Sequence, residues 1–351
     1  MLTTAEKLAN SLPLTINSSR YQYTCVQKIG SGVYGMVFLT QCKRAVKMIE
    51  KSMVPLDEFR IVIEVPEHPN LVHAIDSGVH VMYETYRADK PPRPVVYHFY
   101  VMEVAYCSML NLSINIINLR DKLRCVKDIY SALLHMKRHG YFHGDIHPKN
   151  ILLTSRGFQL CDFSLSLKYN SNKQKLQDAV TSTIPFACPL AVIDNEYFFT
   201  PEYYKYLQTT TDEVIKPFEF LPEKDIIEAA CERKYTEKDM LACDVFAFAQ
   251  LITYLIFDTK SFLCGQTIFC TKTILEQYVK YAREGQAYLD PYIQHSIENN
   301  YLEAQVTLYL QQIEPTSSFN TKTLTELLNH TLCMNPAKRW SLEEMSGILS
   351  W

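Results

Sequence analysis

The stretch of sequence that decides the fold is HGDIHPKNILLTSRGFQLCDFS, residues 143–164. Three oxygen-bearing side chains mark it: Asp145, Asn150 and, near the end, Asp162. Between the last two, apolar residues flank a Ser-Arg-Gly turn, a pattern that predicts a β-hairpin. Carboxylate and amide oxygens bind hard cations such as Mg²⁺, and a carboxylate can accept a proton from a hydroxyl group. These residue types are the ones that metal-assisted proton transfer requires.

A second motif lies near the start of the chain, where Gly30-Ser31-Gly32-Val33-Tyr34-Gly35 has the spacing G-x-G-x-x-G. A dinucleotide-binding turn uses the same spacing but leads from a strand into a helix. Here β-like sequence lies on both sides, so we predict a glycine-rich hairpin whose backbone N–H groups can approach a polyphosphate. Val37 follows, placed to cover a base, and Ala45 and Lys47 lie on the next predicted strand, RAVKMIE.

Together these motifs resemble those of the eukaryotic-type protein kinases, in particular the serine/threonine kinases. The resemblance covers residues 21–348, and the divergent loops resemble those of viral members. It implies an α+β, bilobal protein-kinase fold with a β-rich N-lobe (21–105) and a mainly helical C-lobe (106–348). Residues 1–20 are expected to form an N-terminal extension, a tail or a strap on the small lobe.

The resemblance also implies an activity and assigns roles to residues. The chain would transfer the γ-phosphoryl group of MgATP to serine or threonine hydroxyls of protein substrates. Asp145 would accept the hydroxyl proton, Lys47 would hold the α- and β-phosphates, and Asn150 and Asp162 would bind magnesium. The expected nucleotide-binding residues are Ile29, Gly30, Ser31, Gly32, Val33, Tyr34, Gly35, Val37, Ala45, Lys47, Glu58, Met102, Glu103, Ala105 and Leu152.

In kinases the phosphate-binding lysine is paired with a glutamate on the next helix. The helical pattern that follows Pro55 offers Glu58 and Glu64. They lie about 240° apart around a helix of 3.6 residues per turn, so both cannot face Lys47. Counting back from His68-Pro69-Asn70, which resembles the loop after that helix, favours Glu58.

Three residues depart from the kinase pattern. Gly144 replaces an arginine that in many kinases needs a phosphate on the activation loop, so we expect activity that does not depend on that phosphorylation. His147 and Asn195 stand where serine/threonine kinases carry a lysine and a threonine that contact each other. A hydrogen bond between His147 and Asn195 could substitute for that contact. Ser164 replaces the glycine of the Asp-Phe-Gly motif, which predicts a stiffer turn.

The acceptor stays open between two classes. HGDIHPKN resembles the loop of aminoglycoside and choline kinases, which favours a small molecule. FTPEYY (199–204) and NPAKRWS (335–341) resemble motifs that protein kinases join by an ion pair, here Glu202 with Arg339. Asp244 resembles the helix aspartate that supports the catalytic loop. The protein acceptor is therefore favoured, and a non-catalytic pseudokinase scaffold is the remaining alternative.

Composition excludes several classes. The 351 residues carry a net charge of −3 at pH 7, which gives no bulk attraction to nucleic acid or to an anionic membrane. The apolar stretch 241–257 is interrupted by Asp244 and Gln250 and predicts a buried helix. Eleven cysteines without a CxxC pair, and no signal-peptide pattern, favour an intracellular protein, in cytoplasm or nucleus. The oligomeric state stays open.

Periodicity also predicts elements away from the motifs. Strands are expected at 23–30, 35–41, 44–50, 71–75 and 95–104. Helices are expected at 56–65 and at 123–140. Polar segments at 171–183 and 209–225 predict surface insertions.

Overall fold

The computed structural model describes residues 8, 11–32, 34–53, 56–84, 91–112, 117–169, 237–257, 321–332 and 339–349. The chain divides into two compact units. Unit 1 comprises residues 1–108 and 152–164, and unit 2 comprises residues 109–151 and 165–351. The described part of unit 1 is rich in β-strands and that of unit 2 is mainly helical, which makes the chain an α+β protein. The segment 152–164 groups with unit 1, although it lies within the range predicted for the C-lobe.

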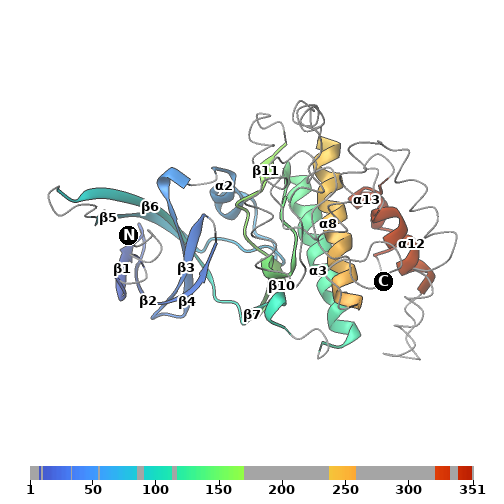
Figure 1. Ribbon diagram of the computed structural model, residues 1–351, viewed down its shortest axis with the longest axis horizontal. Helices are drawn as coiled ribbons and strands as arrows, with labels where there is room; N and C mark the ends of the chain where they lie inside the picture. The colour runs from blue at the N-terminus through green and yellow to red at the C-terminus, as the bar shows by residue number, and fades with distance from the viewer. Residues whose placement is uncertain are drawn as a thin grey trace, which may run out of the picture. The chain divides into compact units, whose positions relative to one another are not determined.

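Unit 1 contains a six-stranded antiparallel sheet with the order β1-β2-β3-β4-β6-β5 (Figure 1). Its strands are β1 (Leu14–Asn17), β2 (Gln22–Ser31), β3 (Gly35–Thr40), β4 (Arg44–Glu50), β5 (Asp76–Glu84) and β6 (Arg93–Glu103). The helices beside it are η1 (Lys51–Met53) and α2 (Leu56–Glu64). The sequence predictions for β2, β3, β4, β6 and α2 are confirmed to within a few residues.

The predicted strand at 71–75 is wrong, because the strand begins at Asp76. Leu71 forms only one isolated bridge, to Leu160. The backbone N–H of Val72 also bonds to Leu160, and that of Ala74 bonds to the carbonyl of Val62 in α2. These N–H groups are therefore bonded to β10 and α2 and not to a neighbouring strand of the six-stranded sheet.

The predicted N-terminal extension contributes a strand to the sheet. β1 pairs with β2 from Leu14↔Cys25 to Asn17↔Gln22, and the side chain of Ile16 is fully buried. The Ser18 hydroxyl donates a 2.5 Å hydrogen bond to Asp76 at the start of β5, and the Tyr23 hydroxyl donates one of 2.9 Å to the same carboxylate oxygen. Since β1 and β5 are the two edges of the sheet, the Ser18 bond joins the end of one edge strand to the start of the other, and the Tyr23 bond connects β2 to β5.

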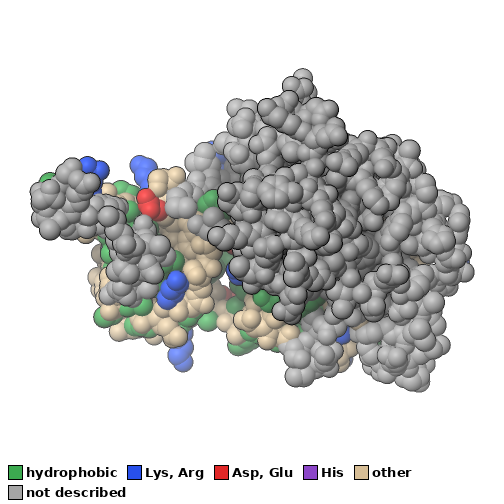
Figure 2. All heavy atoms as spheres, in the orientation of Figure 1, with side chains coloured by type: hydrophobic (Ala, Val, Ile, Leu, Met, Phe, Trp, Pro, Cys, Tyr) green, Lys and Arg blue, Asp and Glu red, His purple; other side chains and the backbone are tan. Residues whose placement is uncertain are grey.

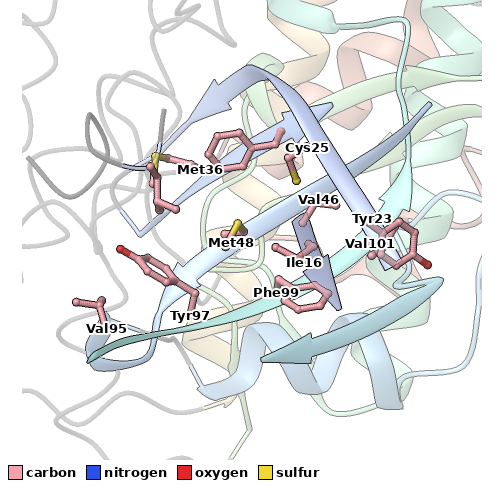
Figure 3. Packing of buried hydrophobic residues seen from close by; sticks show 12 residues of the cluster. Ile16, Tyr23, Cys25, Met36, Val46, Met48, Val95, Tyr97, Phe99 and Val101 are labelled. Carbon is pink, nitrogen blue, oxygen red and sulfur yellow. The ribbon is translucent and has the colours of Figure 1, made fainter. Parts of the chain in front are cut away.

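The alternation of side chains along the strands gives the sheet two distinct faces. One face forms the core of unit 1, whose buried side chains Figure 3 shows packed together. The opposite face carries Val37, Lys47 and Tyr100, which lie opposite one another on β3, β4 and β6, with Ala45 and Met102 as the neighbouring pair. The core residues on the strands are Ile16, Tyr23, Cys25, Met36, Phe38, Val46, Met48, Val95, Tyr97, Phe99 and Val101.

The described part of unit 2 is organised around two long helices, α3 (Leu119–Arg138) and α8 (Glu237–Phe257), which lie side by side (Figure 1). Tyr130 of α3 stacks on Phe248 of α8, with ring centroids 6.3 Å apart. The shorter helices are α12 (Thr321–Thr331), α13 (Leu342–Met345), η2 (Met109–Asn111) and η3 (Pro148–Asn150). Helix α3 begins four residues before the predicted position.

The remaining strands are short. β9 (Ile151–Thr154) and β10 (Gly157–Leu160) form the predicted hairpin, and β7 (Cys107–Ser108) pairs with β9. β8 (Tyr141–Phe142) pairs with β11 (Leu167–Lys168). The predicted insertions at 171–183 and 209–225 lie outside the described residues.

Two properties of the described residues bear on a membrane or a nucleic acid as partner. Within the described residues, the window 237–256 in α8 is the one long and apolar enough to cross a membrane, and 83% of it is buried inside the structure. A core helix has this property, in agreement with the prediction of a buried helix. Figure 2 shows the Lys and Arg side chains on the described surface of unit 1 standing apart, not gathered into one patch, on the face in view.

Candidate active site

In unit 1, Lys47 binds two carboxylates from distant segments. Its Nζ lies 2.5 Å from Oε1 of Glu58 and 2.8 Å from Oδ1 of Asp162. The Tyr100 hydroxyl donates a further hydrogen bond of 2.9 Å to Oε1 of Glu58. Helix α2 is held against this face of the sheet by Phe59, whose ring meets that of Tyr100 edge-on at 5.5 Å. The structure thus pairs Lys47 with Glu58, whereas Glu64 is exposed.

Lys47 and Glu58 are buried and Asp162 is half-buried beside them, so their protonation depends on one another. Burial alone would lower the pKa of Lys47, but the Glu58 and Asp162 carboxylates outweigh it and raise that pKa above its usual value. Burial raises the pKa of Glu58, and the Lys47 ammonium opposes this. Oε2 of Glu58 is buried without a hydrogen-bond partner. Lys47 therefore stays charged and fixed, a cation ready for an anionic ligand.

The glycine-rich turn lies next to this cluster. The N–H of Gly32 donates to the carbonyl of Gly35 at 2.9 Å, which closes the turn between β2 and β3. A Cβ at Gly35 would lie 2.6 Å from the carbonyl oxygen of Met48, so the backbones approach too closely for any other residue. A Cβ at Gly32 would lie 4.0 Å from Oδ2 of Asp162. Asp162 itself has φ of 62°, uncommon for a residue other than glycine and typical of functional sites.

The other predicted nucleotide residues of unit 1 lie on the strands of the sheet, in the turns beside them and on β9. Ala45 and Met102 are buried and directly opposite each other on β4 and β6. Glu103 accepts a hydrogen bond of 2.5 Å from Ser155 in the β9–β10 turn, and Leu152 pairs with Ser108. Gly30 lies opposite Val37, whereas Ile29 and Ser31 on β2 are exposed. Tyr34 and Ala105 are half-buried, and Val33 lies outside the described residues.

In unit 2, the predicted catalytic loop forms its own hydrogen-bond network. Nδ2 of Asn150 donates to the backbone oxygen of Asp145 at 2.9 Å and to its carboxylate Oδ2 at 3.0 Å. Nε2 of His147 lies 3.3 Å from the same Oδ2. Because Nδ2 of Asn150 makes both bonds, its Oδ1 is the atom that can bind a cation.

The loop is supported from behind by Asp244, as the sequence predicted. Its two carboxylate oxygens accept hydrogen bonds from the backbone N–H groups of His143 and Gly144, at 2.7 and 2.9 Å. Burial raises the pKa of Asp244 to about 7, against the lowering effect of these two bonds. Gly144 has φ of +82°, and a Cβ there would lie 2.7 Å from the carbonyl oxygen of Leu165. Both the backbone conformation and the available space require glycine at this position.

The late motif lies in the same unit. Arg339 is buried, donates a hydrogen bond to the carbonyl of Ala242 in α8, and lies over the ring of Phe246 at 4.9 Å from its centroid. Its predicted partner Glu202, the rest of the 199–204 motif and Asn195 lie outside the described residues.

Sequence reasoning missed Tyr100, which binds Glu58. The signal was present: Tyr100 lies two residues before Met102 on one strand, so alternation places both side chains on the same face. Among the described residues, no group of three or more His, Cys, Asp or Glu side chains is placed to hold a metal ion. Single carboxylate and amide oxygens are nevertheless the ligands that Mg²⁺ takes when phosphates supply the others.

Comparison with known proteins agrees with this geometry. The family model described as the protein kinase domain matches residues 23–204, more than half of the chain. The chain therefore belongs to the protein kinase family, as a divergent member of the eukaryotic type.

Three curated relatives are serine/threonine kinases by name. A probable serine/threonine-protein kinase of Dictyostelium discoideum, glkA, is 30% identical over 168 residues, 45% of this chain and 33% of that protein. Serine/threonine-protein kinase GRIK2 of Arabidopsis thaliana is 28% identical over 44% of the chain and 41% of its own length. Serine/threonine-protein kinase greatwall of Ailuropoda melanoleuca is 25% identical over 57% of this chain and 24% of its own length. The chain thus matches less than half the length of each.

Proposed function

We propose that this chain transfers the γ-phosphoryl group of MgATP to serine or threonine hydroxyls of protein substrates within the cell. One observation carries the proposal: Lys47 is bound at 2.5 Å by Glu58 of α2 and at 2.8 Å by Asp162, which lies 115 residues further along the chain. This arrangement fixes a buried cation beside a turn that requires glycine at position 35. A polyphosphate is the ligand that such a cation and such a turn favour.

The residues of unit 1 bind and orient the nucleotide in this proposal. Lys47 holds the phosphates, Glu58 and Tyr100 hold Lys47, and the turn 30–35 covers the phosphates with its backbone N–H groups. Met102 and Ala45 contact the base from the same face of the sheet. Asp162 would supply an oxygen ligand for magnesium, and so would Asn150 of unit 2; the ion would neutralise charge on the phosphates.

The residues of unit 2 act on the acceptor. Asp145 accepts the proton of the attacking hydroxyl, and Asn150 holds its carboxylate. The names of the relatives support a serine or threonine hydroxyl. General-base catalysis of this kind contributes roughly 10²- to 10⁴-fold to a rate.

Transfer of labelled phosphate from γ-labelled ATP tests the proposal. Wild type and Asp145→Ala are assayed with generic protein substrates, and in parallel with amino sugars and choline. We expect label in protein serine and threonine, reduced about 10²-fold or more in the variant. Label in the small molecules alone would establish the other acceptor class. Binding of MgATP without any transfer would establish a pseudokinase.

A further inference from the structure

The His147 ring takes part in two separate hydrogen bonds, one at each ring nitrogen. The backbone N–H of Lys149 donates to Nδ1 at 3.3 Å, so the ring caps the short helix η3. Nε2 lies 3.3 Å from Oδ2 of Asp145. The ring is buried to about nine-tenths of its surface, which limits its freedom to turn away from either partner.

The first bond determines the direction of the second. A neutral imidazole carries its proton on one nitrogen and accepts at the other. Because Nδ1 accepts from Lys149, the proton is on Nε2, and His147 donates to the carboxylate of Asp145. The Asn150 amide donates to the same oxygen at 3.0 Å. Two donors therefore meet at Oδ2 of Asp145 and fix the rotation of its carboxylate.

We propose that His147 is a positioning residue, which holds the Asp145 carboxylate in its catalytic orientation through an Nε2–H donor fixed by the η3 cap. This inference rests on the proposed function, since Asp145 is the base only if the chain is a phosphotransferase. The expected His147–Asn195 hydrogen bond stays a prediction, because Asn195 lies outside the described residues. A merely structural histidine would need only the cap.

Two substitutions separate the roles of the two nitrogens. His147→Asn puts an acceptor oxygen where Nδ1 lies and is a favoured capping residue, but it does not reach Asp145. His147→Gln puts an amide donor where Nε2 lies and gives up the cap. We expect kcat to fall about tenfold in His147→Asn, the loss of one positioning hydrogen bond, with KM for ATP within about twofold of wild type. We expect His147→Gln to recover most of that loss while melting about 2 °C lower.

A matched control removes a cap elsewhere in unit 2. Ser341 accepts from the N–H of Glu344 at the start of α13, away from the catalytic loop. Ser341→Ala should lower the melting temperature as much as His147→Gln does, with kcat unchanged. If His147→Asn keeps the wild-type kcat, or if both histidine variants lose activity in proportion to stability, the positioning role is wrong.

The hydrogen bond itself is tested without any activity. Long-range ¹⁵N–¹H NMR spectra of the ring, assigned by comparison with His147→Asn, should show the Nε2–H tautomer at neutral pH. An Nδ1–H tautomer would overturn the proposal. Wild type that transfers no phosphate would instead refute the proposed function, and the catalytic meaning of the bond with it.

Discussion

In unit 1 the candidate nucleotide site is held by charged side chains from three different elements, whereas in unit 2 the catalytic loop is held through its backbone. Lys47, Glu58 and Asp162 come from β4, α2 and the segment after β10. In unit 2, Asp244 binds two backbone N–H groups of a loop whose functional residues are close in sequence. Removing one charge from the unit 1 cluster therefore leaves another charge buried without its partner. Changing Asp244 in unit 2 instead removes the support of the loop backbone at His143 and Gly144.

The largest effect is expected from Lys47→Met, because it leaves Glu58 buried without its cation. Breaking a buried ion pair in this way costs about 3–5 kcal/mol of folding stability. The double variant Lys47→Met/Glu58→Gln should recover most of this loss, while phosphate transfer stays absent in both. Urea unfolding and the transfer assay measure the two effects. Equal stability of the single and double variants would contradict the coupling.

Asp244→Asn is expected to have the next largest effect, because an amide supplies one acceptor where the carboxylate supplies two. One backbone N–H of the loop is left unpaired, at a cost of about 1–3 kcal/mol. The folded pKa of Asp244, about 7, lies above its usual value, so its contribution to stability is greatest at low pH and is lost as the pH rises through 7. The stability advantage of wild type over Asp244→Asn should therefore narrow between pH 5 and pH 8. A widening gap would show that the two backbone hydrogen bonds stabilise the charged carboxylate by more than burial destabilises it.

Gly144→Ala should destabilise the loop by about 1–2 kcal/mol, the cost of a left-handed backbone at a residue with a Cβ. Contact with the carbonyl of Leu165 adds to that cost. We also expect kcat to fall, because Asp145 is the next residue. Ala at Gly347, where a Cβ would meet nothing within 4 Å, is the control and should change neither quantity. Wild-type behaviour of Gly144→Ala would refute the requirement for glycine.

A smaller effect is expected from Tyr100→Phe, which removes one hydrogen bond to Glu58 and keeps the ring against Phe59. The free energy of unfolding should fall by about 1 kcal/mol. Titration calorimetry should show MgATP binding weakened by a few-fold, with transfer at saturating ATP close to wild type. Unchanged affinity would mean that Lys47 alone positions Glu58.

The smallest effect is expected from phosphatase treatment. Gly144 supplies no arginine for an activation-loop phosphate, and the structure leaves no space for a side chain at that position. Transfer by the dephosphorylated protein, with removal of phosphate verified by mass spectrometry, should match that of untreated protein. Abolished activity would show that another cation takes the place of the arginine.

The same contrast explains what the sequence could predict. The loop residues 143–150 and the choice of Glu58 over Glu64 could be predicted, because both depend on short spacings along the chain. β5 was not predicted, because its apolar residues Val79, Val81 and Tyr83 lie on the exposed side of the strand. The position of β5 is determined by its pairing with β6, and such pairing cannot be recognised from the local composition of the segment.

The sequence places Tyr100 on the face of Met102, but the contacts that Tyr100 and His147 make could not be predicted from it. Both sets of contacts depend on side-chain rotamers and on strand register. A sequence motif shows that residues are near one another, but not which of their atoms are in contact. The predicted tail 1–20 contains β1, a four-residue strand too short to give a clear alternation. The partner of Arg339 stays a prediction, since residue 202 is outside the described ranges.

The central claim is that unit 1 binds the nucleotide and that Asp145 of unit 2 performs the transfer. Single-turnover transfer and MgATP affinity, measured together on Asp145→Ala, test it most directly. The account predicts wild-type affinity with a transfer rate lower by about 10²-fold or more. Transfer at the wild-type rate in this variant would contradict it.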